Sequence, residues 1–404
     1  MSKVPAGHFV RVTRYTTDTL RYFELQVGGG GKTSNEEECV DELRQALDET
    51  VLQSVHSDVE VGCFLSGGVD SSALLAVASR QHGRPIRTYS MGFDEPGFDE
   101  RAYGRLVSQA FKSRHCEVRL SRQKAVDIAE HIVNHLDEPF ADSSALPTFA
   151  LAERAARDVK AVLSGEGMDE LFAGNNWHPP GSTPVTGNQE KHMLNHLSRA
   201  IFKDRTLAGL YPDGLPGDLA SEPVARLKPE ATIFAQAAVD RRLAFDLSTY
   251  LPSDLLVKMD RLPMLNSLEV RVPYLNAPFA RLLAGMDISM KIRGGVQKYL
   301  FKKMLKGVLP DVILDRPKQG FAIPLDIWLW QDGRFRELVY DVLGDSRTRQ
   351  RGLFNTTVIQ TMLDEHGRLD QFHGYRLWTL FVLEMWQRRV QDALSVPCVV
   401  PPHG

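Results

Sequence analysis

The chain has 404 residues, of which 43% are hydrophobic and 25% are charged, and its formal net charge is -3. This composition is typical of a globular protein with one large or two smaller domains, and the near-neutral charge favours neither a nucleic-acid nor a membrane partner. No apolar run is long enough to span a bilayer and the first residues lack a hydrophobic signal core, so we expect a cytoplasmic protein. The four cysteines are scattered without CxxC spacing, which argues against a zinc knuckle or a disulfide framework.

The first part of the chain predicts surface strands followed by a helix. Residues 8–27 alternate apolar and polar side chains, as one or two strands do. Four glycines and the run Lys32-Thr33-Ser34 follow; a Walker A loop would need glycine where the chain has Gln26, so we predict a flexible linker. From Asn35 the pattern indicates a helix, with acidic residues at its positive end and an apolar face of Val40, Leu43, Leu47 and Val51.

The next segment, Val61–Leu75, has the strongest local signal in the chain. Its apolar start fits a buried parallel strand, and its Ala/Leu-rich end fits a helix packed on that strand. Between them lies SGGVDSS, residues 66–72. Glycines allow a sharp turn and close approach of a ligand, while hydroxyls and the helix N-terminus offer hydrogen bonds to an anion. The loop is therefore a candidate phosphate site.

Asp70 distinguishes this loop from a Walker loop, because an acid beside phosphates requires a cation between them, most simply Mg²⁺. A plain strand-to-helix turn would explain an isolated SGG, but not the complete SGGVDSS after an apolar strand. The pattern resembles the pyrophosphate loop of the ATP pyrophosphatases, which split ATP to AMP and pyrophosphate while forming an adenylate. The resemblance implies ATP and Mg²⁺ as ligands.

Strands and helices alternate over the following hundred or so positions, which indicates an α/β fold with a parallel sheet covered on both faces. Ligands bind at the carboxyl ends of such strands, and Ser66 and Ser164 both lie there. Residues 175–230 are rich in Pro, Gly and polar residues and predict a loop or insertion, after which the chain is mostly helical to about Asp392. The elements expected before the insertion are strands at 86–93, 115–120 and 159–163, and helices at 100–111, 125–136 and 146–157.

A second cluster of functional residues lies in VLSGEGMDELFAG, residues 162–174, where Glu166 and Asp169 follow an apolar strand. An acid-rich helix start is common by itself, but these acids would share a sheet edge with the phosphate loop, which suits Mg²⁺ binding and proton transfer. SGEGMDELFAG together with SGGVDSS resembles the synthetase domain of the asparagine synthetase family. Further segments resemble the same family in the same order, so that the resemblance covers roughly residues 36–335: 137–145, 246–251, 255–261, 268–275 and RPKQGF at 316–321.

The resemblance implies a set of functional residues. Glu166 corresponds to a position implicated in acid/base work on the incoming nitrogen, and Lys318 to a lysine proposed to stabilise the adenylating transition state. Asp70 and Asp169 would hold Mg²⁺. For Lys258 and Arg271, plain salt-bridge roles are equally open, and His131 and His135 have metal-binding spacing without further ligands. The residues expected around ATP and pyrophosphate are Leu65, Ser66, Gly67, Gly68, Asp70, Ser71, Ser72, Met91, Gly92, Ser164 and Gly165.

The same resemblance suggests a division of the chain. Residues 1–35 would be strands and a linker left from the junction with a glutaminase domain, residues 36–175 an ATP-binding α/β part, residues 176–395 a mainly helical part and residues 396–404 a disordered tail. Glutamine-using members carry a cysteine directly after the initiator Met, where this chain has Ser2. We therefore expect the nitrogen to come from free ammonia, an amine or a separate glutaminase subunit, unless the sequence is a fragment of a longer product.

The predicted function is an amide-forming ligase that adenylates a carboxylate, first of all the aspartate side chain, and releases AMP and pyrophosphate. Formation of a β-lactam or a macrolactam is an alternative with the same chemistry, and an inactive regulatory subunit is disfavoured by the intact Asp70, Asp169 and Lys318. Met168 and Asn175-Asn176 depart from the family pattern, which leaves the acceptor open. The oligomeric state is also open, a homodimer included.

Overall fold

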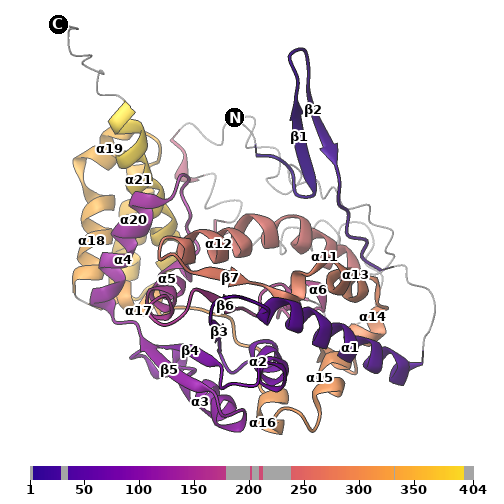
Figure 1. The fold of residues 1–404 in the computed structure, drawn as a ribbon. Coiled ribbons are helices and arrows are strands. Elements are labelled where there is room, and N and C mark those ends of the chain that lie inside the picture. Colours follow the sequence, from indigo (N-terminus) through magenta and orange to yellow (C-terminus); the bar gives the residue numbers. More distant parts are fainter. Residues whose placement is uncertain are drawn as a thin grey trace, which may run out of the picture.

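The computed structural model describes residues 3–28, 35–178, 201–202, 209–212, 238–331 and 333–394. At its centre is a five-stranded sheet with the order β5-β4-β3-β6-β7, in which all neighbouring strands are parallel (Figure 1). This confirms the predicted α/β class. The strands are β3 (Val61–Phe64), β4 (Arg87–Gly92), β5 (Arg114–Arg119), β6 (Ala161–Leu163) and β7 (Glu269–Arg271).

The sheet separates two hydrophobic cores, because successive side chains of a strand point to opposite faces. In β3, Val61 and Cys63 join one core and Phe64 joins the other. All four residues of β3 and all three of β6 are buried, as expected for strands covered on both sides. Helices that contribute to the first core are α1 (Glu36–Val55), α2 (Val69–Gln81), α13 (Ala277–Gly285) and α15 (Tyr299–Leu305); those of the second include α4 (Arg122–His135), α5 (Ala145–Ala155) and α12 (Leu256–Met264).

Helix α1 forms where its pattern predicts it. The Asn35 side chain accepts a hydrogen bond from the backbone N–H of Glu37, which caps the helix, and three glutamates in the first turn complement its positive end. Leu43, Leu47 and Val51 are at most 1% exposed, so the predicted apolar face is the one that packs on the core. The burial of this face fixes the helix against the sheet.

The C-terminal half is mainly helical, as predicted, but it also supplies the edge strand β7, which the sequence pattern did not indicate. β7 has only three residues, and its one apolar residue, Val270, is half-buried. The other elements after residue 237 are α11 (Ala238–Ser248), η2 (Leu251–Leu255), η3 (Pro273–Leu275), α14 (Ile288–Lys291), β8 (Ile292–Arg293), β9 (Val296–Gln297), α16 (Asp311–Leu314), α17 (Leu325–Trp330), α18 (Arg334–Gly344), α19 (Ser346–Arg351), α20 (Thr356–Arg368) and α21 (Gly374–Leu394).

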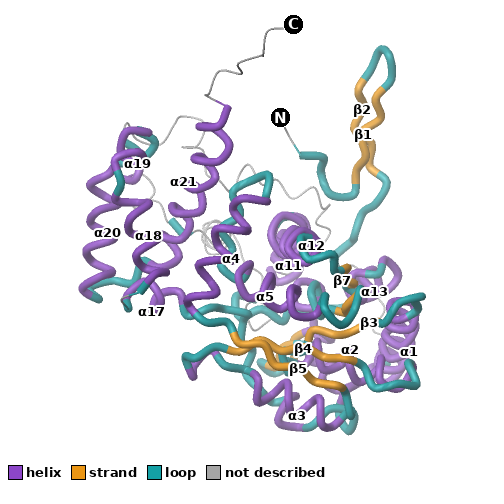
Figure 2. The backbone as a smooth tube through the Cα atoms, turned by 60° about the vertical axis from the view of Figure 1, so that its left-hand side comes forward, coloured by secondary structure: helices purple, strands orange, loops and turns teal. Residues whose placement is uncertain are grey.

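The N-terminal strands form an antiparallel hairpin of β1 (His8–Val12) and β2 (Thr17–Arg21), which projects from the body of the molecule (Figures 1 and 2). Most of the linker predicted at 28–34, most of the insertion at 175–230 and the tail at 396–404 lie outside the described residues. In the part that is described, no helix has the length and apolar character needed to cross a membrane.

Candidate functional site

The loop between β3 and α2 forms one wall of a large cavity of about 1690 Å³. Gly67 has φ +72°, and a Cβ there would come within 2.5 Å of the Tyr103 backbone, so the close approach of the loop to α3 (Arg101–Ala110) requires glycine. The Ser66 and Ser71 hydroxyls lie 3.0 Å apart, and the Gly68 N–H donates to Ser66 Oγ at 3.2 Å. The loop is thus internally ordered, and the first turn of α2 opens onto the cavity.

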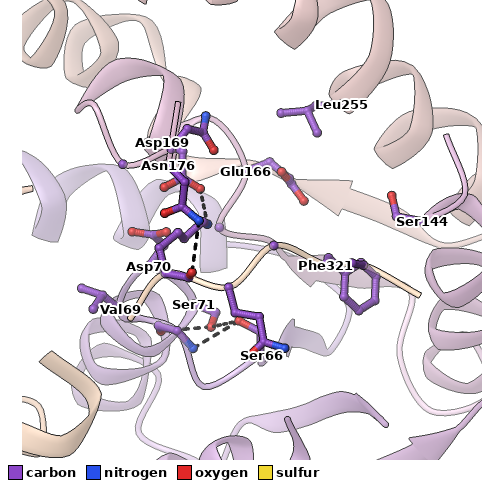
Figure 3. Close-up of a pocket in the computed structure, with 18 of the residues that line it drawn as sticks. Ser66, Val69, Asp70, Ser71, Ser144, Glu166, Asp169, Asn176, Leu255 and Phe321 are labelled. Atoms are coloured by element: carbon purple, nitrogen blue, oxygen red, sulfur yellow. Dashed lines mark hydrogen bonds and ion pairs between the residues drawn. The ribbon is translucent and has the colours of Figure 1, made fainter. Parts of the chain in front are cut away.

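A second loop, after β6, brings the acids into the same cavity. A Cβ on Gly165 would lie 3.2 Å from Asp70 Cβ, which shows how closely the two loops approach. The short helix α6 (Met168–Leu171) then carries Asp169. Glu166 lies near the middle of the cavity (Figure 3). Asp70 and Asp169 line the cavity on one side of it, and Ser144, Leu255 and Phe321 line the cavity on the other.

Among the described residues, the Glu166 carboxylate has no hydrogen bond or ion pair. Burial raises the pKa of Glu166, and the positive charges of Lys258 and Lys318 act in the opposite direction. A carboxylate with a raised pKa and no fixed partner can accept a proton from a ligand in the cavity. The role of Glu166 on an incoming nitrogen stays a prediction.

Two lysines bind the acids of the site. Lys298 Nζ lies 2.6 Å from Asp70 Oδ2 and 2.6 Å from Asp169 Oδ1, and Lys318 Nζ lies 2.5 Å from Asp169 Oδ2. Burial raises the pKa of Asp70 in spite of Lys298. Asp169 behaves differently. Burial alone would raise its pKa, but the ammonium groups of Lys298 and Lys318 hold that pKa below its ordinary value. Burial lowers the pKa of Lys318, but the negative charge of Asp169 more than offsets this effect. The pKa of Lys318 is therefore raised.

Lys298 is the site residue that sequence reasoning missed. It follows the two-residue strand β9 and adopts a left-handed conformation, φ +54°, that is uncommon for a residue other than glycine. Nothing in the local sequence VQKYLFKK distinguishes it from the lysines that follow. Only the packing of the chain brings it to Asp70, 228 positions away.

The carboxylates of Asp70 and Asp169 converge on one cation, the Lys298 ammonium. Both carboxylates therefore share one positive charge in this structure. Within the described residues there is no group of three or more His, Cys, Asp or Glu side chains that could hold a metal ion. The Mg²⁺ role stays a prediction. His131 and His135 stack on each other with ring centroids 4.0 Å apart.

The segment Arg316–Phe321 lies across the site without forming a helix or a strand. Arg316 pairs with Glu100, its guanidinium lies 3.9 Å from the Tyr103 ring centroid, and it donates to the Ser66 carbonyl at 3.4 Å. These contacts hold the segment against α3 and the phosphate loop. At its centre, Lys318 reaches Asp169 on the opposite wall.

The other two candidate cations have structural partners. Lys258 Nζ donates to Asp142 Oδ2 at 2.8 Å and to Ser144 Oγ at 2.7 Å, which fixes the segment at 137–145 to α12. Arg271 donates to the carbonyls of Ser54 and His56 and lies outside the main cavity. The salt-bridge interpretation fits Arg271, whereas Lys258 also lines the cavity.

The cavity gathers most of the predicted site. Gly67 and Gly92 do not line it, because both support packing around α3: a Cβ on Gly92 would overlap Asp99 and Arg101. Ser72 is fully buried beneath the loop, and its hydroxyl has no partner among the described residues. The predicted residues that line the cavity are Leu65, Ser66, Gly68, Asp70, Ser71, Met91, Ser164, Gly165, Glu166, Asp169 and Lys318.

Similar proteins were found for nearly the whole chain. A putative glutamine-hydrolysing asparagine synthetase of Mycobacterium tuberculosis is 30% identical over an alignment that covers 99% of this chain and 66% of that protein. A glutamine-hydrolysing asparagine synthetase of Bacillus subtilis is 27% identical, covering 87% of this chain and 60% of its own length. Amidase chry2 of Gibberella zeae is 21% identical, with coverages of 85% and 60%.

The chain thus spans just under two thirds of the length of the mycobacterial relative. The model of the asparagine synthase family matches residues 42–388, which include both loops, all five strands of the sheet, Lys298 and Lys318. Since this match covers most of the chain, the protein belongs to the asparagine synthase family.

Proposed function

We propose that the chain catalyses ATP-dependent amide formation, in which a carboxylate is first converted to an acyl adenylate. The observation that carries this proposal is that Lys298 and Lys318 both pair with Asp169, while Lys298 also pairs with Asp70 of the Ser66–Ser72 loop. Such an arrangement provides backbone N–H groups for the phosphates and fixed positive charge where negative charge develops. The family uses ATP, and the loop supplies a matching anion site.

In the first step, a carboxylate oxygen of the acceptor attacks the α-phosphorus of ATP, and the bond to the bridging oxygen breaks so that pyrophosphate leaves. The loop holds the leaving group through its N–H groups and hydroxyls. Lys318 lies on a segment clamped at Arg316, so its ammonium is held in place rather than mobile. Asp70 and Asp169 would hold Mg²⁺, which would neutralise phosphate charge when bound.

In the second step, the nitrogen nucleophile attacks the acyl carbon and AMP leaves. The nitrogen must lose a proton to become a neutral amide. Glu166 has no described partner of its own and a raised pKa, and therefore it is the group placed to take that proton. The aspartate side chain is our first candidate for the acceptor, with ammonia as the nucleophile; asparagine synthetase is the name carried by the mycobacterial and Bacillus relatives.

The experiment is to measure pyrophosphate and amide formation separately, with ATP, Mg²⁺ and aspartate, and with ammonium or glutamine as nitrogen donor. Lys318→Met is expected to lower pyrophosphate release by about a hundredfold or more. Glu166→Gln is expected to spare pyrophosphate release and to lower amide formation by about a hundredfold or more. Lys124→Met is the control, because it changes an exposed lysine of α4 whose one ion pair with the described residues is to Glu153.

Asparagine formed with ammonium would establish aspartate as the acceptor. If no tested carboxylate supports pyrophosphate release in folded wild-type protein, the proposed function is wrong. If Glu166→Gln lowers both products equally, the second-step role of Glu166 is wrong while the ligase activity stands. A dependence on a separate glutaminase subunit would appear as amide formed from glutamine only when that subunit is added.

A further inference from the structure

The residues after α6 include a short segment, Asn175–His178, that is buried at both ends and that the ligase chemistry above does not use. Asn175 is 5% exposed and His178 is 1% exposed. Buried polar side chains in native proteins almost always have hydrogen-bond partners, and those partners show what the side chains hold in place. Two of these residues, Asn175 and Asn176, are positions where the sequence departs from the family pattern.

Asn175 connects two parts of the site. Its side-chain Nδ2 donates to Glu170 Oε1 at 2.8 Å, on the helix that carries Asp169. Its backbone carbonyl accepts a hydrogen bond from Gln297 Nε2 at 2.7 Å. Gln297 directly precedes Lys298, so this contact fixes the chain just before the lysine that bridges the two acids.

The conformation of Lys298 makes that contact important. A left-handed backbone is unfavourable for an ordinary residue, and it persists only where surrounding contacts determine it. Lys298 Nζ must nevertheless reach both Asp70 and Asp169. Gln297, held by the Asn175 carbonyl, supplies a contact at the point where the backbone turns.

The neighbouring residues anchor the segment and extend its reach. Asn176 Nδ2 donates to the Lys318 carbonyl at 3.4 Å, so the segment also contacts the second lysine. Trp177 Nε1 and His178 Nε2 each lie 3.0 Å from Asp246 Oδ2 on α11. The Asn175 N–H donates to His178 Nδ1 at 3.1 Å, which leaves Nε2 to carry the ring proton toward Asp246.

We propose that Asn175 is a positioning residue: anchored to α11 through His178, it holds Glu170 and Gln297 so that Lys298 spans Asp70 and Asp169. This inference rests on the proposed function and adds a residue to it. Asn175 acts through its neighbours. Its loss should therefore lower kcat/KM for ATP and leave KM for the acceptor unchanged.

The test exchanges the two partners of the buried hydrogen bond. The assays are run above pH 8, where Glu170 is ionised and cannot donate a hydrogen bond. Under these conditions Asn175→Asp places a carboxylate opposite the Glu170 carboxylate and removes the donor. The double variant Glu170→Gln with Asn175→Asp restores a bond, because the Gln amide can donate to the Asp carboxylate. Asn276→Asp is the matched control, since Asn276 also donates its side-chain amide to a side-chain oxygen, that of Gln53, but outside the site.

The readouts are kcat and KM for ATP and for the acceptor, with thermal unfolding as a check on folding. We expect Asn175→Asp to lower kcat/KM for ATP by about tenfold or more, with KM for the acceptor unchanged. The double variant should recover most of that loss, and Asn276→Asp should match the wild type. If Asn175→Asp does not fold, Gln297→Leu, which removes the donor to the Asn175 carbonyl, takes its place with the same expected loss.

Two results would overturn the inference while wild-type pyrophosphate release still supports the proposed function. One is that folded Asn175→Asp has the kcat/KM for ATP of the wild type. If Asn175→Asp does not fold, the same result in Gln297→Leu counts instead. The other is a folded double variant that is as impaired as Asn175→Asp alone. A wild-type protein that binds ATP but releases no pyrophosphate with any carboxylate would instead contradict the proposed function.

Discussion

Gly174 lies against Lys298, the lysine that pairs with both Asp70 and Asp169, and the position requires a residue without a side chain. A Cβ on Gly174 would overlap Lys298 Cε and Asp169 Oδ1. We predict that Gly174→Ala displaces Lys298 from at least one of its two carboxylates. Because a displacement of about 1 Å in such a site can reduce a rate about a hundredfold, pyrophosphate release should fall by that order.

Gly344→Ala is the matched control for this substitution. Gly344 ends α18, its φ is not positive, and nothing lies within 4 Å of an added Cβ. Initial rates at saturating ATP, together with circular dichroism of both variants, provide the comparison. Wild-type turnover in Gly174→Ala would show that the contact of Lys298 with both acids is dispensable.

Glu170 should make the free energy of unfolding decrease as the pH rises. Burial and the charge of Asp169 raise the pKa of Glu170 to about 8, from a model-compound value of 4.5. The folded protein therefore favours the protonated carboxyl. Its contribution to stability is complete below pH 4.5 and is lost as the pH rises through about 8.

Glu170→Gln keeps an acceptor for Asn175 and cannot ionise, so it isolates this contribution. The free energy of unfolding of the wild type minus that of Glu170→Gln should fall between pH 4.5 and 8, while shifts of other groups cancel in the difference. Urea unfolding at several pH values measures it. Parallel curves for the two proteins across this range would refute the raised pKa.

At the scale of elements, the sequence predicted what local pattern determines. The apolar face of α1 and its cap at Asn35 are local signals, and both appear as expected. β7 was missed because a three-residue strand is defined by its pairing with β6 rather than by its own residues. The segment Arg316–Phe321 was placed in the site by resemblance, but its clamp to Glu100, 216 positions away, has no sequence signal.

The whole site is assembled from parts of the chain that are far apart. The two loops after β3 and β6 could be predicted to meet, because adjacent parallel strands end at one edge of the sheet. The cations could be predicted only where resemblance marked them, as at Lys318. Lys298 reaches its partners through the packing of α15 against α1, which no local pattern encodes.

Because the site is built from segments that are far apart in the chain, we expect nucleotide binding to stabilise the whole folded state. ATP with Mg²⁺ at a hundredfold excess over its Kd should stabilise the folded state by about 2.7 kcal/mol, seen as a higher midpoint of thermal unfolding. Adenosine at the same concentration should give a much smaller shift, because the loop, Lys298 and Lys318 would all act on the phosphates. Equal shifts for adenosine and ATP would mean that the phosphates are not held there. A large shift with ATP alone would instead show that ligand contacts at this site connect the loop after β3 to residues more than two hundred positions further along the chain.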